Sequence, residues 1–316
     1  PPMIAIYTGH RATDPVQQHQ CIAYSNDRGR SWTKYELNPV LDIGVCDFRD
    51  PKVFWHKDTQ HWIMAVALSA EQRIQFYTSV NLKDWSHVSD FTVANPLDNL
   101  WECPDLFPLP IDGDSSRIKW VLVISVNPGA LHGGSGMIYL IGDFNGEVFT
   151  PDQEFIPGDP ELPFKERMHW VDHGKDFYAA VTWSDIPKKD GRRIWLGWMN
   201  SWEYAREIPT TPWRGMMSIP RTLGLSSTPK GIRLVQKPIN ELQILRCGIN
   251  EFSNLNFKNH FKLPNAIKLN SNQYELIINI DLINTDLFGI RLCIGPEQST
   301  IIEYNKVQNQ ITFDRT

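Results

Sequence analysis

The chain alternates between short apolar runs, rich in β-branched and aromatic residues, and clusters of Gly, Pro, Asn and Asp. Apolar runs bounded by turn residues are typical of β-strands, and a 3.6-residue helical period is hardly seen. The runs that predict strands are residues 3–8, 21–25, 52–55, 62–68, 74–79, 120–126 and 137–142. The pattern therefore predicts an all-β protein.

One segment of this pattern repeats. Tyr24-Ser25-Asn26-Asp27 leading to Trp32 is matched by Tyr77-Thr78-Ser79 leading to Trp85, and a looser third copy lies between residues 139 and 149. Four-stranded units that recur about every 40 to 50 residues are typical of propeller blades, and we interpret the repeated segment as each blade's outer hairpin. This interpretation places blades at residues 3–35, 50–88, 102–149 and 177–235. A β-sandwich is the less regular alternative.

The composition changes after Pro238. Trp disappears, Asn and Ile become more frequent, and residues 274–282 alternate between polar and apolar positions. Alternation of this kind predicts an antiparallel sheet with one face in water. We therefore expect two domains, a propeller over residues 1–237 and a smaller β-sandwich domain over residues 238–316.

Length and charge narrow the range of partners. With 316 residues and a formal net charge of −5, the chain can bury a sizeable core and carries no basic stripe. This argues against binding to nucleic acid or to an anionic membrane and favours a small or neutral partner. The 12 Trp residues suit the apolar faces of sugars, although core packing is their commoner role.

Metal sites, cofactors and targeting signals are not indicated. The 5 cysteines lack Cys-x-x-Cys or Cys/His spacing, which argues against structural zinc or a disulfide framework. Residues 133–136 are Gly-rich but have the context of a loop, not of a phosphate cradle. The first residues have the pattern of a strand and not of a signal peptide, no apolar run reaches membrane-spanning length, and no Asn-x-Ser/Thr acceptor is present.

The candidate chemistry lies in two short strings. Phe48-Arg49-Asp50-Pro51 and Trp101-Glu102-Cys103-Pro104-Asp105 each place a carboxylate between an aromatic residue and a proline at the start of a predicted blade. The first strand of every blade lines the axis of a propeller, so equivalent positions converge on one pocket. Glycoside hydrolysis needs carboxylates on both sides of one bond. The two strings therefore predict a sugar-cleaving site.

The order of these motifs resembles glycoside hydrolase family 32, the β-fructosidases that include invertases, exo-inulinases and levanases. The resemblance rests on both strings and on residues 53–55, 81–85, 127–129, 176–180, 197–202, 212–214 and 313–316. It implies a five-bladed propeller followed by a β-sandwich. It also implies retaining hydrolysis of terminal non-reducing β-D-fructofuranosyl residues in fructans or sucrose, without a cofactor, by a secreted protein.

The sequence departs from the family pattern at the nucleophile. Family members begin their first blade with a Trp-Met-Asn-Asp-Pro-Asn-Gly segment, and this sequence has none. Asp14, Asp27 and Asp159 lack the flanking residues of that segment and do not replace it. We expect a fragment in which the first blade is largely absent, the sandwich is truncated, and two of three catalytic acids are present.

The resemblance assigns roles to both carboxylates. Glu102 is expected to be the general acid/base, for which Trp101 and Cys103 offer a partly apolar setting. Asp50 is expected to stabilise the transition state through hydrogen bonds to fructose hydroxyls. The alternatives are a surface glutamate on a blade edge and an Asp-Pro turn.

Five further residues are candidates for substrate binding. Arg49 is expected to contact sugar, with an ion pair to a carboxylate as the alternative. Cys103 is expected to tune the carboxyl of Glu102 by contact, and Trp202 to border the fructose. Asp176 and Tyr178 are weaker candidates for direct sugar contact, because an aspartate beside an aromatic strand often caps a hairpin instead.

Three alternatives to a fructan hydrolase stay open at this point. The first is a truncated homologue that at most binds sugar, which the missing nucleophile favours. The second is an invertase with sucrose as its main substrate, although the Gly197–Tyr204 stretch looks more like exo-acting inulinases and levanases. The third is a related five-bladed glycosidase that acts on arabinans, which the string around Glu102 disfavours.

Overall fold

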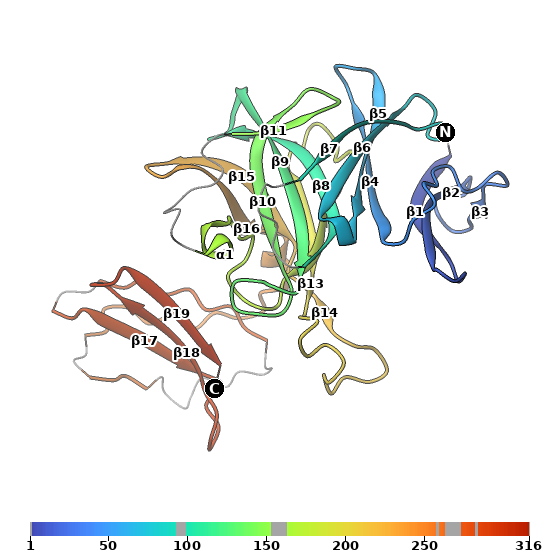
Figure 1. Cartoon of the computed structure of the whole chain (residues 1–316). Coiled ribbons are helices and arrows are strands. Elements are labelled where there is room, and N and C mark those ends of the chain that lie inside the picture. Colours follow the sequence, from blue (N-terminus) through green and yellow to red (C-terminus); the bar gives the residue numbers. More distant parts are fainter. Residues whose placement is uncertain are drawn as a thin grey trace. The chain divides into compact units, whose positions relative to one another are not determined.

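The computed structural model describes residues 2–92, 99–152, 163–256, 259–262, 273–281 and 284–315. Almost all regular structure in these ranges is β, which confirms the predicted class (Figure 1). Within these ranges, helical residues are confined to α1 (Phe164–Arg167) and two 3-10 segments, Ser69–Glu71 and Asn240–Leu245. The chain separates into two compact units, Pro1–Arg246 and Cys247–Thr316. This division falls slightly beyond the expected one at residue 238.

The strands of the first unit form four antiparallel sheets in chain order, and a parallel pairing of Ile111 with Leu225 joins the third and fourth into one nine-stranded sheet (Figure 1). The first sheet is β1 (Met3–Arg11), β2 (Gln17–Ser25) and β3 (Thr33–Lys34). The second is β4 (Phe48–His56), β5 (His61–Leu68), β6 (Arg73–Ser79) and β7 (Ser86–Phe91). The third is β8 (Leu100–Ile111), β9 (Asp114–Asn127), β10 (Gly136–Phe144) and β11 (Phe149–Pro151). The fourth is β12 (Tyr178–Thr182), β13 (Arg193–Met199), β15 (Arg221–Thr228) and β16 (Gly231–Pro238), with β14 (Met216–Met217) also paired to β13.

These sheets match the predicted blades, and all the predicted strand runs of the first unit lie within observed strands. The repeated segment is the β2–β3 hairpin in the first sheet and the β6–β7 hairpin in the second. In each hairpin the tryptophan ring N–H donates to a carbonyl three residues earlier, from Trp32 to Gly29 at 3.0 Å and from Trp85 to Leu82 at 3.2 Å. The sequence repeat therefore encodes a repeated turn.

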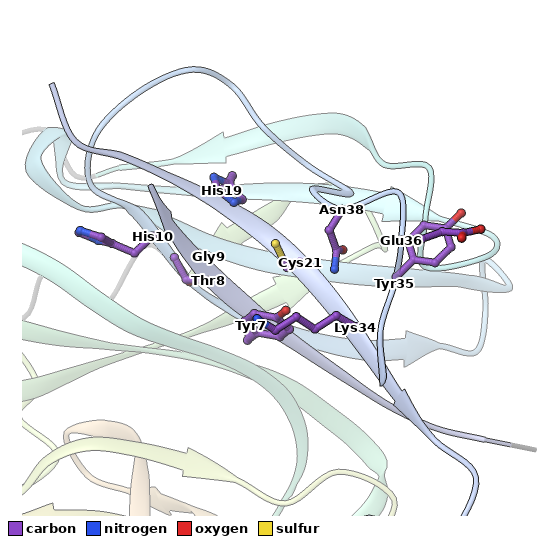
Figure 2. Close-up of a pocket in the computed structure, with 10 residues that line it drawn as sticks. All are labelled: Tyr7, Thr8, Gly9, His10, His19, Cys21, Lys34, Tyr35, Glu36 and Asn38. Atoms are coloured by element: carbon purple, nitrogen blue, oxygen red, sulfur yellow. The ribbon is translucent and has the colours of Figure 1, made fainter. Parts of the chain in front are cut away.

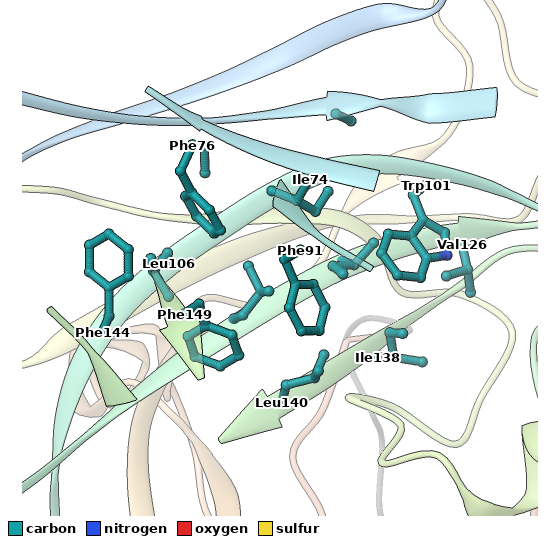
Figure 3. Close-up of a cluster of buried hydrophobic side chains, with 14 of the residues drawn as sticks. Ile74, Phe76, Phe91, Trp101, Leu106, Val126, Ile138, Leu140, Phe144 and Phe149 are labelled. Atoms are coloured by element: carbon teal, nitrogen blue, oxygen red, sulfur yellow. The ribbon is translucent and has the colours of Figure 1, made fainter. Parts of the chain in front are cut away.

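Buried strands with two apolar faces hold neighbouring sheets together. Along β5, alternate side chains enter two different clusters, because successive residues of a strand point to opposite faces. Ile63, Ala65 and Ala67 pack between the second and third sheets, whereas Met64 and Val66 pack toward the first. Figure 3 shows the cluster between the second and third sheets, where Phe76 and Phe91 meet residues of the third sheet such as Trp101, Leu106, Leu140 and Phe149. Such double burial explains why these strands are continuous apolar runs in the sequence.

The second unit contains one antiparallel sheet in the part described, with the order β17 (Leu287–Leu292), β18 (Thr300–Asn305) and β19 (Gln310–Arg315). The expected antiparallel sheet is present, but the strand predicted at 274–282 is wrong for residues 274–281, which belong to no strand. Leu282, the last residue of that predicted strand, lies outside the described residues, as does Asp159 from the search for a nucleophile. Alternation indicates a two-faced segment, but a strand also needs a paired neighbour, which alternation alone does not supply.

The first strands of the second, third and fourth sheets, β4, β8 and β12, lie side by side. A buried ion pair joins them, since Lys52 Nζ lies 3.2 Å from Asp105 Oδ2 and donates to the carbonyl of Thr182 at 2.5 Å. The backbone N–H of Thr182 donates to the same Asp105 oxygen at 2.7 Å. One charged pair thus ties together three strands that are distant in the sequence.

Replacing Lys52 with Met is expected to lower the free energy of unfolding by about 3–5 kcal/mol, because it leaves the Asp105 carboxylate, 1% exposed, without its cation. Urea denaturation of the purified chain measures the change. Lys57→Met, at an exposed position just after β4, is the matched control and should stay within about 0.5 kcal/mol of wild type. A loss below about 1 kcal/mol for Lys52→Met would show that the pair does not hold the strands together.

Candidate active site

The first strands of the second, third and fourth sheets, here called the inner strands β4, β8 and β12, each carry a bulge near their start. The pairing register shifts after Arg49 in β4, after Glu102 in β8 and after Tyr178 in β12. A bulge sets two successive residues against one residue of the partner strand and so re-aims their side chains, and bulges are frequent beside active sites.

The residue that follows each of these three positions has a left-handed backbone. Its φ is 64° at Asp50, 46° at Cys103 and 51° at Ala179. Positive φ is uncommon for residues other than glycine and is maintained only where neighbouring groups fix it. The three strands therefore present three pairs of successive residues, Arg49-Asp50, Glu102-Cys103 and Tyr178-Ala179, in one constrained geometry.

These pairs meet at the guanidinium of Arg49. Its Nε lies 3.3 Å from Glu102 Oε1 and 4.0 Å from Asp50 Oδ2, and its Nη2 lies 3.2 Å from the same Glu102 oxygen. Both carboxylates are thus within 4.0 Å of one nitrogen atom. The structure brings together the two acids that the sequence placed 52 positions apart.

Asp50 is held in a partly desolvated setting. Burial raises the pKa of its carboxyl, with the negative charge of Glu102 acting in the same direction. The backbone N–H of Cys103, which donates to Asp50 Oδ2 at 3.0 Å, and the charge of Arg49 oppose this rise. The side chain is 28% exposed, so the carboxylate remains open to a ligand.

Cys103 contacts Asp50, whereas the sequence suggested contact with Glu102. Its sulfur lies 3.6 Å from Asp50 Oδ2. Burial raises the pKa of this thiol well above its usual value, and the charge of Asp50 adds to the effect. The thiol therefore stays protonated and serves as a weak donor, not as a nucleophile.

Arg49 forms the ion pair that the sequence left as the alternative to sugar contact. Besides Glu102, it donates to Asp47 Oδ1 at 2.5 Å, Ser69 Oγ at 2.9 Å and Gln18 Oε1 at 3.3 Å. Burial by itself would lower the pKa of Arg49, but the hydrogen bond to Asp47 and the charge of Glu102 outweigh it and raise the pKa. The guanidinium is consequently a fixed positive charge between the two carboxylates.

Tyr178 completes the environment of Glu102. Its hydroxyl donates to Glu102 Oε2, while Arg49 occupies Oε1. Burial raises the pKa of Tyr178, so the hydroxyl remains a donor at neutral pH. The two oxygens of Glu102 therefore have different partners, one cationic and one neutral.

Trp202 is connected to this network through aromatic contacts. The Trp198 ring lies 6.3 Å from that of Tyr178 and 5.1 Å from that of Trp202, which is 48% exposed. Asp176 instead accepts a hydrogen bond from Tyr204, which engages its carboxylate within the loops beside β12 and β13. Five of the seven predicted residues thus share one contact network, Trp202 borders it, and Asp176 is bound to Tyr204.

Sequence reasoning missed the supporting residues Asp47, Gln18, Ser69 and Thr8, which lie outside both motifs. The sequence carries no signal for these four residues, but it carries one for the contact between the two motifs, since Arg49 and Glu102 are 53 positions apart, as are Asp50 and Cys103. This offset equals that of the repeated hairpin between Tyr24 and Tyr77. Extending the repeat inward would have aligned these four positions and predicted that they meet.

A cavity of about 440 Å³ lies on the first sheet (Figure 2). It is lined by residues of β1, β2 and β3 and of the segment that follows β3. Thr8 lines it and also contacts the backbone of Asp50. Glu36 is its one acidic residue, so the lining does not provide the paired carboxylates of sugar hydrolysis.

No group of three or more His, Cys, Asp or Glu side chains able to hold a metal ion occurs among the described residues. In the same ranges, no helix combines the length and apolar character needed to cross a membrane.

The all-β propeller thus brings two carboxylates together from the first strands of neighbouring sheets, which is the chemistry that glycoside hydrolases use. Residues 2–238 match the family described as "Glycosyl hydrolases family 32 N-terminal domain". The chain belongs to this family.

Known relatives agree with this assignment. The chain is 42% identical over 321 residues to a levanase of Bacillus subtilis, covering 100% of this chain and 45% of the relative. It is 41% identical over 257 residues to an extracellular exo-inulinase of Aspergillus niger, covering 75% of this chain and 46% of the relative. The chain thus spans about half the length of these relatives.

Solved structures show the same fold. An exo-inulinase from Aspergillus awamori matches 99% of this chain and 63% of its own, with a TM-score of 0.77 and 31% identity. A fructofuranosidase from Schwanniomyces occidentalis, complexed with fructose, matches 100% of this chain and 61% of its own, with a TM-score of 0.72 and 30% identity.

Proposed function

We propose that the protein carrying this chain hydrolyses terminal non-reducing β-D-fructofuranosyl residues of fructans or sucrose with retention of configuration. The observation that carries the proposal is the meeting of Asp50 and Glu102 at one guanidinium, on bulged inner strands of neighbouring sheets. The names of the relatives, levanase and exo-inulinase, support fructans as the substrate class. The description of the exo-inulinase as extracellular supports a secreted protein.

Glu102 is the general acid/base in this proposal. It protonates the glycosidic oxygen of the leaving group and then removes a proton from the attacking water. Arg49 and Tyr178 fix its two oxygens, so the carboxyl meets the substrate in one orientation. An oriented proton donor avoids the entropic cost of finding that geometry during the reaction.

Asp50 is the transition-state stabiliser. Its oxygens accept hydrogen bonds from fructose hydroxyls, which strengthen as positive charge develops on the ring. Cys103 and Arg49 hold this carboxylate, and the exposed ring of Trp202 offers a face for the sugar. The third acid, the nucleophile, has no candidate in this sequence.

The test measures monosaccharide release from inulin, levan, sucrose and arabinan, both by the chain and by the longest natural protein that contains it. Fructose release from any of the first three supports the proposal, and methyl β-D-fructofuranoside formed in added methanol supports retention. Activity restricted to the longer protein would place the nucleophile outside this chain. If neither protein releases fructose while calorimetry detects fructose binding, the sugar-binding alternative replaces the enzyme.

A further inference from the structure

We propose that Thr8 is a positioning residue that fixes the backbone of Asp50 for transition-state stabilisation. Thr8 lies on β1 of the first sheet, 42 positions before Asp50, and belongs to neither motif. The proposal rests on the proposed function, because it gives Thr8 a purpose only if Asp50 acts on substrate.

A closed set of hydrogen bonds connects Thr8 to the bulge of β4. The backbone N–H of Asp50 donates to Thr8 Oγ1 at 3.0 Å, and the Thr8 hydroxyl donates to Gln20 Oε1 at 3.0 Å. The amide nitrogen of Gln20 then donates to the carbonyl of Phe48 at 2.9 Å. We call these two side chains the Thr8–Gln20 clamp.

The clamp holds the chain on both sides of Arg49. Phe48 and Gln20 are 0% exposed, so their polar groups cannot exchange these bonds for water. Asp50, at φ 64°, lies in a backbone region that residues other than glycine rarely adopt. Bonds at residues 48 and 50 therefore fix the position where the strand leaves regular geometry, and with it the direction of the Asp50 side chain.

At the other two bulges, the backbone N–H of the residue with positive φ is likewise bound by a side chain of the neighbouring sheet. The N–H of Cys103 donates to Asp50 Oδ2 at 3.0 Å, and that of Ala179 donates to Ser125 Oγ at 3.2 Å. Each of the three left-handed residues thus has its N–H bound by a side chain of the preceding sheet. Thr8 fills this place for Asp50, the one residue of the three that carries a carboxylate.

Loss of the Thr8 hydroxyl should shift the side chain of Asp50 while leaving its carboxylate in the site. A displacement of about 1 Å in a catalytic group can lower a rate by about 10²-fold. Because Asp50 acts mainly on the transition state, kcat should fall while KM changes little. A residue needed only for stability would instead lower the amount of folded protein and leave the kcat of the folded fraction unchanged.

The experiment compares Thr8→Val, Thr8→Ser and Thr78→Val in the protein that carries this chain. Val keeps the shape of Thr8 but removes the hydroxyl, and Ser restores it. Thr78 is a half-buried threonine of β6 whose hydroxyl makes no hydrogen bond among the described residues, so it is the matched control. Two readouts are taken: kcat and KM for sucrose, corrected for the folded fraction, and hydrogen exchange of peptides that contain residue 50.

We expect Thr8→Val to lower kcat about 10- to 100-fold, to change KM less than about threefold, and to speed exchange at residue 50. Thr8→Ser and Thr78→Val should resemble wild type in both readouts. Should Thr8→Val not fold, Thr8→Ala removes the same hydroxyl and carries the same expectations.

Two failures are distinguishable. An active wild type whose Thr8→Val variant keeps its kcat would overturn the positioning role of Thr8. A wild type without activity on any fructan or sucrose would overturn the proposed function, and with it the role of Thr8, even if exchange at residue 50 still showed the hydrogen bond.

Discussion

Replacing Glu102 with Gln is expected to lower kcat on sucrose and inulin about 10²- to 10⁴-fold, the usual contribution of a general acid/base. Gln keeps the size of the side chain; its carbonyl oxygen can still accept from Arg49, and its NH2 group can donate to the oxygen of Tyr178, so the site should retain its shape. It cannot donate a proton to the leaving oxygen. Initial rates of fructose release, measured with the protein that carries this chain, give the change.

A second substrate, whose leaving group needs no protonation, tests the acid role of Glu102 more specifically. Fluoride departs without protonation, so β-D-fructofuranosyl fluoride should restore a large part of the first step in Glu102→Gln. Glu147→Gln, at an exposed glutamate in the turn between β10 and β11, is the matched control and should behave as wild type. An equal loss on sucrose and on the fluoride would contradict the acid role and indicate a structural one.

The all-β fold and most of its strands could be predicted from the sequence, because a strand that is buried on both faces is a continuous apolar run. The Tyr24–Trp32 segment likewise predicts a turn, in which the ring N–H of Trp32 donates to the carbonyl of Gly29. Both features depend on residues close together in the sequence. The strand predicted at 274–281 was wrong because its alternation did not reveal which segments pair.

The composition of the site could be predicted only where a motif is contiguous. Arg49, Asp50, Glu102 and Cys103 lie in two short strings, and Tyr178 lies in a third. The residues that hold them, such as Thr8 and Asp47, come from other sheets or loops, and a single side chain without a local pattern gives no signal. Contact between Cys103 and Asp50, rather than Glu102, likewise depends on how neighbouring sheets dock.

The bulges explain why short motifs can define a site shared by three sheets. An ordinary strand turns successive side chains to opposite faces, whereas each bulge presents two neighbouring residues against one partner residue. Arg49 with Asp50 and Glu102 with Cys103 occupy equivalent places at the 53-position offset. One repeated backbone irregularity thus supplies both the carboxylates and the groups that hold them.

Replacing Asp50 with Asn is expected to lower kcat about 10²- to 10³-fold and at the same time to raise the thermal midpoint at neutral pH. The loss of rate follows because the amide carries no charge to stabilise the positive ring. The gain in stability follows from the raised pKa of Asp50, since burial penalises its ionised form in the folded state. A carboxyl with a raised folded-state pKa contributes stability below its unfolded value, 3.8, and loses it as the pH rises through the folded-state value. The neutral amide has no such loss.

Melting curves from pH 3 to pH 7 measure this, with Asp27→Asn as the matched control. Hydrogen bonds from Ser31 lower the pKa of Asp27 to about 2, so its ionisation contributes stability that is present above the unfolded value, 3.8, and is lost as the pH falls toward 2. Asp27→Asn should therefore lower the midpoint slightly at pH 7, opposite in sign to Asp50→Asn. The advantage of Asp50→Asn should shrink as the pH falls toward 3.8. A variant at Asp50 that is less stable than wild type at pH 7 would show that the hydrogen bond from Cys103 and the charge of Arg49 outweigh the cost of burying this carboxylate.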